Sequence, residues 1–263
     1  MDIMGGMYLR RFAQKVNPFL ALLIGLSLLG IEGLCQENLA NADPQLVEVE
    51  LSPLIPLDSS GSFYLLPYRY RRTTWGSTLG LSFGTFVPLN FEPNYYADEF
   101  GDVYGDQSYG MVELHFSIKR NFSLFSLGLD LGTGFYNASA AKGYQSNISV
   151  IPIRAGLRLS LEGLSDEGYF VPYVAGGAYT MMYDESQSGN SSAGNTQAAL
   201  YGSAGVQVQI NWLDPVSAIE AYRESGIENS FVFAEARYFG FSAAPQDPDF
   251  SAIYFSLGMM VEF

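Results

Sequence analysis

Eight segments of the chain alternate apolar residues with polar or small ones, which is the pattern of strands that face two different environments. In the first segment, Leu79, Leu81 and Phe83 share one face, while glycine and serine occupy the other. A tilted strand needs about 9–11 residues to cross a bilayer, and every segment reaches that length. Only the fifth is ambiguous, because both of its faces are apolar or small. The segments are 75–87, 109–119, 122–135, 148–161, 169–183, 198–212, 229–241 and 251–263.

This alternation predicts an all-β fold, an eight-stranded antiparallel up-and-down transmembrane β-barrel. Hydrocarbon offers no water to unpaired backbone groups, so strands that span a membrane must close into a barrel. An even strand number is also the habit of bacterial single-chain barrels. A soluble β-sandwich shows alternating strands as well and remains the competing interpretation. It explains neither the N-terminal segment nor the loop lengths described next, so we favour the barrel.

Long and short connections alternate along the chain and predict which end of the barrel faces outward. Long polar loops follow the odd-numbered strands, whereas the turns at 120–121 and 162–168 are short. Outer-membrane barrels place short turns in the periplasm and long loops outside the cell. The exception is a short helix predicted at 216–224 on the periplasmic side. Asp214 is its expected N-cap, Pro215 its first residue, and Gly226 lies past its end.

The N-terminus has the features of a secretory signal peptide. Arg10 and Arg11 precede an apolar run at 19–31 that is too short to span a bilayer comfortably. Two cleavage sites are open, one after Cys35 and one after Ala42. We therefore assign 1–35 to the signal peptide, with cleavage after 42 as the alternative. Residues 36–68, which contain several prolines, are assigned to a periplasmic linker, and 69–263 to the barrel.

Cys35 is the only cysteine, so a disulfide within the chain is impossible. It could instead be a lipidated first residue of the mature chain, although Leu34 is a poor residue for the preceding position. His115 is the only histidine, and it alternates with Glu113 and Ser117 on a predicted lumen face. A chain with one cysteine and one histidine has no His/Cys metal cluster. We expect no cofactor and interpret His115 as lumen filling.

The polar faces of the strands place charged residues inside the predicted barrel. Three acids and three arginines fall near mid-barrel, and an eight-stranded barrel is just wide enough for side chains to fill it. Buried charges are costly unless they are paired. We therefore predict an ion-pair network that plugs the lumen, and a gated polar path through the same residues is the alternative. The network comprises Glu113, Asp130, Arg154, Arg158, Glu235 and Arg237.

The net charge of −14 argues against a nucleic-acid partner, because phosphates require a basic surface. Much of the excess acid lies in the long loops, including Asp98, Asp102 and Asp106 in the first and Glu185 in the third. Carboxylate oxygens suit hard cations, so the first three are candidates for a metal site. Their spacing is not that of an EF-hand loop, and we favour a solvated, repulsive surface. No extracellular ligand can be named.

Basic residues gather at the opposite rim, where the sequence predicts contact with anionic lipid headgroups. They are Arg69, Arg71, Arg72, Lys119 and Arg120.

The final strand resembles the C-terminal insertion signal of outer-membrane barrels, with apolar residues at every second position and a terminal aromatic residue. The positions are Phe255, Leu257, Met259, Val261 and Phe263. The segments 151–157 and 171–177 also resemble strands of small OmpA-, OmpX- and OmpW-like barrels. The likeness covers about 75–263. It implies an outer-membrane location in a Gram-negative-type bacterium, with the barrel assembly machinery and outer-membrane lipids or lipopolysaccharide as partners.

Together these features predict a non-enzymatic surface barrel with a plugged lumen and acidic, aromatic extracellular loops. The alternative is a narrow channel for small or hydrophobic molecules, which the OmpW resemblance implies. A lipid-modifying enzyme is a third possibility. The sequence disfavours it, because His115 lies on a lumen face rather than at the lipid-facing rim.

Overall fold

The computed structural model describes residues 54–56, 63–89, 103–104, 109–140, 146–187, 190–242 and 248–263. All of them belong to one compact unit, Ser52–Phe263. The predicted signal peptide, both candidate cleavage sites and most of the predicted linker lie outside these residues.

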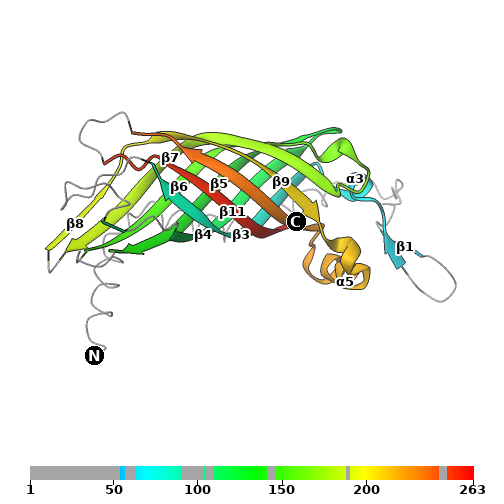
Figure 1. Ribbon diagram of the computed structural model, residues 1–263. Coiled ribbons are helices and arrows are strands. Elements are labelled where there is room, and N and C mark those ends of the chain that lie inside the picture. The colour runs from blue at the N-terminus through cyan, green and yellow to red at the C-terminus, as the bar shows by residue number, and fades with distance from the viewer. Residues whose placement is uncertain are drawn as a thin grey trace, which may run out of the picture. The chain divides into compact units, whose positions relative to one another are not determined.

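Eight strands form a closed antiparallel barrel in which each strand pairs with its neighbour in sequence (Figure 1). The last strand returns to pair with the first, from Ala252 opposite Pro88 to Glu262 opposite Thr78. The predicted eight-stranded up-and-down barrel is therefore confirmed. Its strands are β3 (Trp75–Pro88), β4 (Tyr109–Asn121), β5 (Ser126–Ser139), β6 (Ser146–Ser160), β7 (Phe170–Gln187), β9 (Ala199–Gln209), β10 (Asn229–Phe239) and β11 (Ala252–Glu262).

The two faces of each strand differ in burial as the alternation predicted. On β3, Leu81 and Phe83 point outward and are exposed, whereas Ser82 between them is 2% exposed in the lumen. The ambiguous strand β7 is also resolved, because Tyr173 is buried inside and Val174 is exposed outside. The outer face of the barrel is thus apolar, and its interior is polar and aromatic.

The predicted helix is present as α5 (Pro215–Ser225). It follows a 3₁₀ turn, η2 (Asn211–Leu213), where the sequence predicted the end of the sixth strand. The Asp214 carboxylate accepts a hydrogen bond from the Ser217 backbone N–H at 3.1 Å, which satisfies a free donor of the first turn. Gly226 ends the helix with φ of 66°, a conformation that glycine adopts without steric cost. No helix within the described part of the chain combines the length and apolar character needed to span a bilayer.

Four further short elements lie before the barrel or between its strands. The strands β1 (Leu54–Pro56) and β2 (Phe63–Leu65) pair with each other inside the segment assigned to the linker. The short helix α3 (Tyr68–Arg71) leads into β3, and the 3₁₀ turn η1 (Glu162–Leu164) connects β6 to β7. The expected linker therefore contains ordered structure.

The predicted third long loop, 184–197, is largely strand instead. The sheet continues along β7 as far as Gln187, and β8 (Asn190–Asn195) pairs with it as a hairpin. Thr196 fixes the base of this hairpin, because its hydroxyl accepts from the Met181 backbone N–H at 3.0 Å. The sequence did not predict these strands, because their small polar residues show no alternation of apolar side chains.

Gly177 of β7 provides a test of the close strand packing. A Cβ atom there would overlap the Ala155 carbonyl oxygen and the Gly156 Cα of β6, whereas a Cβ at Gly202 of β9 would meet nothing within 4 Å. We expect Gly177→Ala to lower the free energy of unfolding by about 1–3 kcal/mol, as overpacking does.

The matched control, Gly202→Ala, should change it little. Urea unfolding of the folded protein in micelles measures both variants. Equal stability of the two would contradict the close approach of β6 and β7.

Candidate functional site

The lumen is filled by side chains at three successive depths, which the inward face of β4 illustrates. Met111, Glu113 and Lys119 follow one another along this face, and all three are buried. Met111 belongs to an aromatic cluster at the end of the long loops. Glu113 belongs to a central ion-pair cluster, and Lys119 to a polar cluster around Tyr68 at the opposite end. Each depth is described in turn.

The central cluster comprises Glu113, Asp130, Arg154, Glu235 and Arg237, which come from four strands. Arg154 donates from Nε to Glu113 at 2.7 Å and pairs through another nitrogen with Asp130. Arg237 donates to both oxygens of Glu113 at 2.7 Å and also pairs with Glu235. Glu113 therefore lies between two guanidinium groups. Five of the six predicted network residues meet in this cluster.

A glycine on β5 makes room for this arrangement. Gly132 lies opposite Arg154 in the ladder, and a Cβ atom there would overlap the guanidinium group. A larger residue at this position would force Arg154 away from its two carboxylates.

Arg158, the sixth predicted residue, makes no ion pair within the described part of the chain. Its guanidinium carbon instead lies 3.6 Å from the centroid of the Tyr173 ring, and the Tyr173 hydroxyl donates to Glu235 at 2.9 Å. Arg158 is thus connected to the central cluster through an aromatic ring. Tyr173 was not predicted, because the alternation of β7 is ambiguous in the sequence.

His115 packs beside the central cluster, on the lumen face where the sequence placed it. Its Nε2 lies 2.8 Å from the Ser82 hydroxyl, and its Nδ1 lies 2.7 Å from a nitrogen of Arg154. The ring also packs edge-on against Phe233, with 5.3 Å between ring centroids. In the residues that the structure describes, no group of three His, Cys, Asp or Glu side chains is arranged to hold a metal ion.

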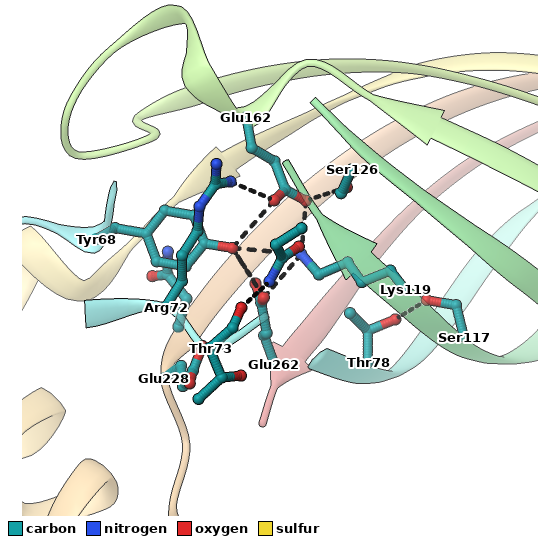
Figure 2. Close-up of polar contacts among 12 residues, drawn as sticks. Tyr68, Arg72, Thr73, Thr78, Ser117, Lys119, Ser126, Glu162, Glu228 and Glu262 are labelled. Carbon is teal, nitrogen blue, oxygen red and sulfur yellow. Dashed lines mark hydrogen bonds and ion pairs between the residues drawn. The ribbon is translucent and has the colours of Figure 1, made fainter. Parts of the chain in front are cut away.

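The Tyr68 cluster closes the end of the barrel near α5 and was missed by the sequence analysis. Figure 2 shows the Tyr68 ring reaching into the barrel from α3, with its hydroxyl among acidic side chains. The hydroxyl donates to Glu262 with distances of 2.7 and 2.8 Å to its two oxygens. Lys119 Nζ lies 2.5 Å from Glu162 and 2.7 Å from Glu262. The cluster comprises Tyr68, Arg72, Lys119, Ser126, Glu162 and Glu262.

Arg72 and Ser126 complete the hydrogen bonds of Glu162. Arg72 donates to Glu162 at 3.0 Å, and the Ser126 hydroxyl donates to the same carboxylate at 2.8 Å. Although burial alone raises the pKa of Glu162, the Lys119 ammonium beside it holds the pKa below its usual value. Burial, together with the negative charge of Glu262, raises the pKa of Tyr68 well above 10. Tyr68 therefore remains a neutral hydroxyl that can donate.

These contacts correct the expectation of headgroup contact for three of the five basic residues at this rim, Arg71, Arg72 and Lys119. Arg120 is exposed, and for it and Arg69 the expectation stays a prediction. Lys119 and Arg72 pair with carboxylates inside, and the buried Arg71 donates to the Glu228 carbonyl oxygen. A buried cation is costly without a partner, so these side chains turn toward the acids. Arg69 is part-exposed and pairs with Asp166 at 3.3 Å.

The aromatic cluster fills the opposite end of the lumen. Phe86 packs against Tyr136 and Phe239, with 4.9 and 6.1 Å between ring centroids. Tyr104, from the first long loop, is 1% exposed and donates to Glu185 at 3.0 Å. The structure therefore corrects the placement of Glu185 in a solvated acidic loop, because this carboxylate is fully buried on β7.

Two candidate sites from the sequence remain, the acidic residues of the first long loop and the C-terminal strand. The carboxylates of Asp98, Asp102 and Asp106 lie outside the described residues, so the candidate metal site stays a prediction. In the C-terminal strand, Phe255, Leu257 and Met259 point outward, with 56–66% of each residue exposed. This places an apolar stripe on the outer face of β11, between β10 and β3.

Glu113 provides a test of the central cluster. We expect Glu113→Ala to lower the free energy of unfolding by about 3–5 kcal/mol, because it leaves two buried guanidinium groups short of a counter-charge. Arg69→Ala, which breaks a part-exposed ion pair, should cost at most about 1 kcal/mol. Chemical unfolding in micelles measures both variants. If Glu113→Ala lowered the free energy of unfolding as little as Arg69→Ala does, the central ion pairs would not stabilise the barrel.

Glu228, which precedes β10, provides a test by pH. Burial and the nearby charge of Glu262 raise the pKa of its carboxyl to about 7. The folded chain thus binds this proton more tightly than the unfolded chain does, so this group lowers the free energy of unfolding as pH rises from about 5 to about 7. Glu228→Gln should reduce this decrease in the free energy of unfolding with pH. Chemical unfolding at several pH values measures the slope. Glu224→Gln, which changes an exposed carboxylate of α5, is the control and should keep the wild-type slope.

No protein-family model matches the sequence, and no curated protein matches it. Among solved structures, the fold is similar to Ail, the attachment invasion locus protein of Yersinia pestis, with 14% identity and a TM-score of 0.43 over 73% of this chain and 100% of that chain. It is also similar to the neisserial surface protein NspA, with 12% identity and a TM-score of 0.41 over 73% and 98% of the two chains.

A third similar structure is the N-terminal β-barrel domain of OprF from Pseudomonas aeruginosa, with 14% identity and a TM-score of 0.36 over 71% and 97% of the two chains. These likenesses concern the fold alone. The barrel architecture of this chain is established by its own strand order and closure.

Proposed function

We propose that this chain is a non-enzymatic integral β-barrel of the bacterial outer membrane whose closed lumen supports surface-exposed loops and an extended hairpin. The observation that carries the proposal is the inversion of polarity between the two faces of the barrel. Charged side chains such as Glu113 and Arg237 are buried at the centre, while apolar side chains such as Leu257 are exposed outside.

The outer face supports a membrane location. Soluble proteins rarely expose contiguous apolar patches of more than a few hundred Å², and such patches mark interaction surfaces. Here exposed leucine, phenylalanine, valine and methionine side chains occur on every barrel strand. Backbone groups inside hydrocarbon must all be paired, and a closed barrel meets this condition without an edge.

The three clusters support a closed lumen rather than a channel. The central carboxylates each have a guanidinium partner, and Lys119 is held between Glu162 and Glu262. An ion that crossed would have to displace both sets of ion pairs and the aromatic cluster. A small cavity between the central and Tyr68 clusters is lined by Thr78, Ser117 and Arg158, among others, and it suits a water molecule.

The hairpin of β7 and β8 supports a surface role. Within the described residues, β8 pairs only with β7, and its side chains are largely exposed. A strand with an unpaired edge can accept a further strand from a partner. We assign the chain outer-membrane lipids, including lipopolysaccharide, as its surroundings. The barrel assembly machinery is its partner during insertion, and an extracellular macromolecule binds its exposed surface.

Conductance in planar bilayers tests the closed lumen. We expect the inserted wild-type barrel to show no stable discrete openings, since the lumen is filled at three depths. A shift in gel mobility between unheated and boiled samples from the same preparation shows that the barrel is folded. Stable openings that disappear in Arg158→Ala or Glu113→Ala would overturn the closed lumen and favour the channel.

A further inference from the structure

The connection between β9 and α5 exposes three large apolar side chains within five residues. Trp212, Leu213 and Val216 are exposed by 57%, 64% and 67%. They belong to η2 and the first turn of α5, and we call residues 211–216 the interfacial turn. This turn follows the end of β9, so the exposed side chains lie beyond the barrel strand that leads into it.

Local hydrogen bonds hold the interfacial turn in this conformation. The Trp212 indole N–H donates to the Gln209 carbonyl oxygen at 2.8 Å, and the Leu213 backbone N–H donates to Ile210 at 3.0 Å. Asp214 then caps α5 through Ser217. The indole has its polar atom satisfied by the protein, so its remaining surface is apolar.

The interfacial turn continues the apolar outer face of the barrel at the end that carries the short turns. The Gln209 backbone N–H donates to the Tyr169 carbonyl oxygen, and both Tyr169 and Phe170 are exposed. Trp75, the first residue of β3, is also 61% exposed at this end. Tryptophan and tyrosine are enriched where hydrocarbon meets water in membrane proteins.

We propose that the interfacial turn inserts into the headgroup region of the periplasmic leaflet and anchors α5 against the lipid surface. The occupant of this patch is phospholipid, because the patch is continuous with a surface that the proposed function assigns to lipid. The exposed charged side chains of α5 lie beyond it, at Glu220, Arg223 and Glu224, and remain in water. The inference rests on the proposed membrane location and adds a second lipid contact to it.

The chain has only two tryptophans, so each can report its own surroundings. The full chain is reconstituted into phosphatidylcholine vesicles as Trp75→Phe, which leaves Trp212, and as Trp212→Phe, which leaves Trp75. The lipids are unmodified or brominated near the headgroup end of the acyl chains, where bromine quenches a nearby indole. We expect the fluorescence of each variant to fall about two-fold in the brominated vesicles, because both indoles lie at the interface.

Val216→Asp, added to Trp75→Phe, provides a matched variant. An acidic residue is favourable in the first turn of a helix, so α5 remains formed while the apolar patch loses a side chain. Quenching of Trp212 should then decrease, and quenching of Trp75 in the corresponding Trp212→Phe background should not change.

The outcomes separate the inference from the proposed function. Quenching of Trp75 without quenching of Trp212 would overturn the lipid contact of the interfacial turn and leave the barrel in the membrane. If chemical crosslinking then joined two chains through this turn, the occupant would be a second copy. Absence of quenching at both positions would overturn the membrane location itself. Quenching of Trp212 that Val216→Asp leaves unchanged would also contradict the proposed anchor.

Discussion

The structure depends on the pairing of β11 with β3, which closes the ring of eight barrel strands. Closure of only eight strands leaves a lumen that side chains must fill, because there is no room for a continuous water column. Any charge that points inward is then separated from water. The paired arrangement of Glu113 with Arg154 and Arg237 follows from this constraint, and so does the placement of Lys119 between two carboxylates.

The three clusters fill the lumen in physically different ways. The aromatic cluster fills volume without charge and is nearest the loops, where Tyr104 brings the first loop into contact with the barrel. The central cluster connects β4, β5, β6 and β10 by directional ion pairs and thereby limits changes of strand register. The Tyr68 cluster connects α3, which lies outside the barrel strands, to the end of the barrel.

The sequence alone predicts the features that depend on local alternation. It identifies all eight barrel strands, the outward faces of all of them except β7, and the helix capped by Asp214, because each leaves a periodic or positional signal. It also predicts that Glu113, Asp130 and Arg154 lie on the lumen faces of their strands. It does not predict the inward direction of Tyr173, since both faces of β7 are apolar or small. The strand β8 is missed because small polar residues build it through backbone pairing alone.

The position of Tyr68 could not be predicted from the sequence, because no periodic pattern of residues surrounds it. Its position follows from Glu262, which is 194 residues away and buried at the end of the last strand. The hydrogen bond joins a residue placed before the first barrel strand, β3, to the last residue of the final strand, β11. The acceptor takes its place only when β11 has been added between β10 and β3, so the hydrogen bond from Tyr68 to Glu262 forms only in the closed barrel. The contact thus joins the two ends of the barrel sequence only after closure, and a chain that stalls before its final strand would lack this bond while keeping the contact of Tyr68 with Glu162.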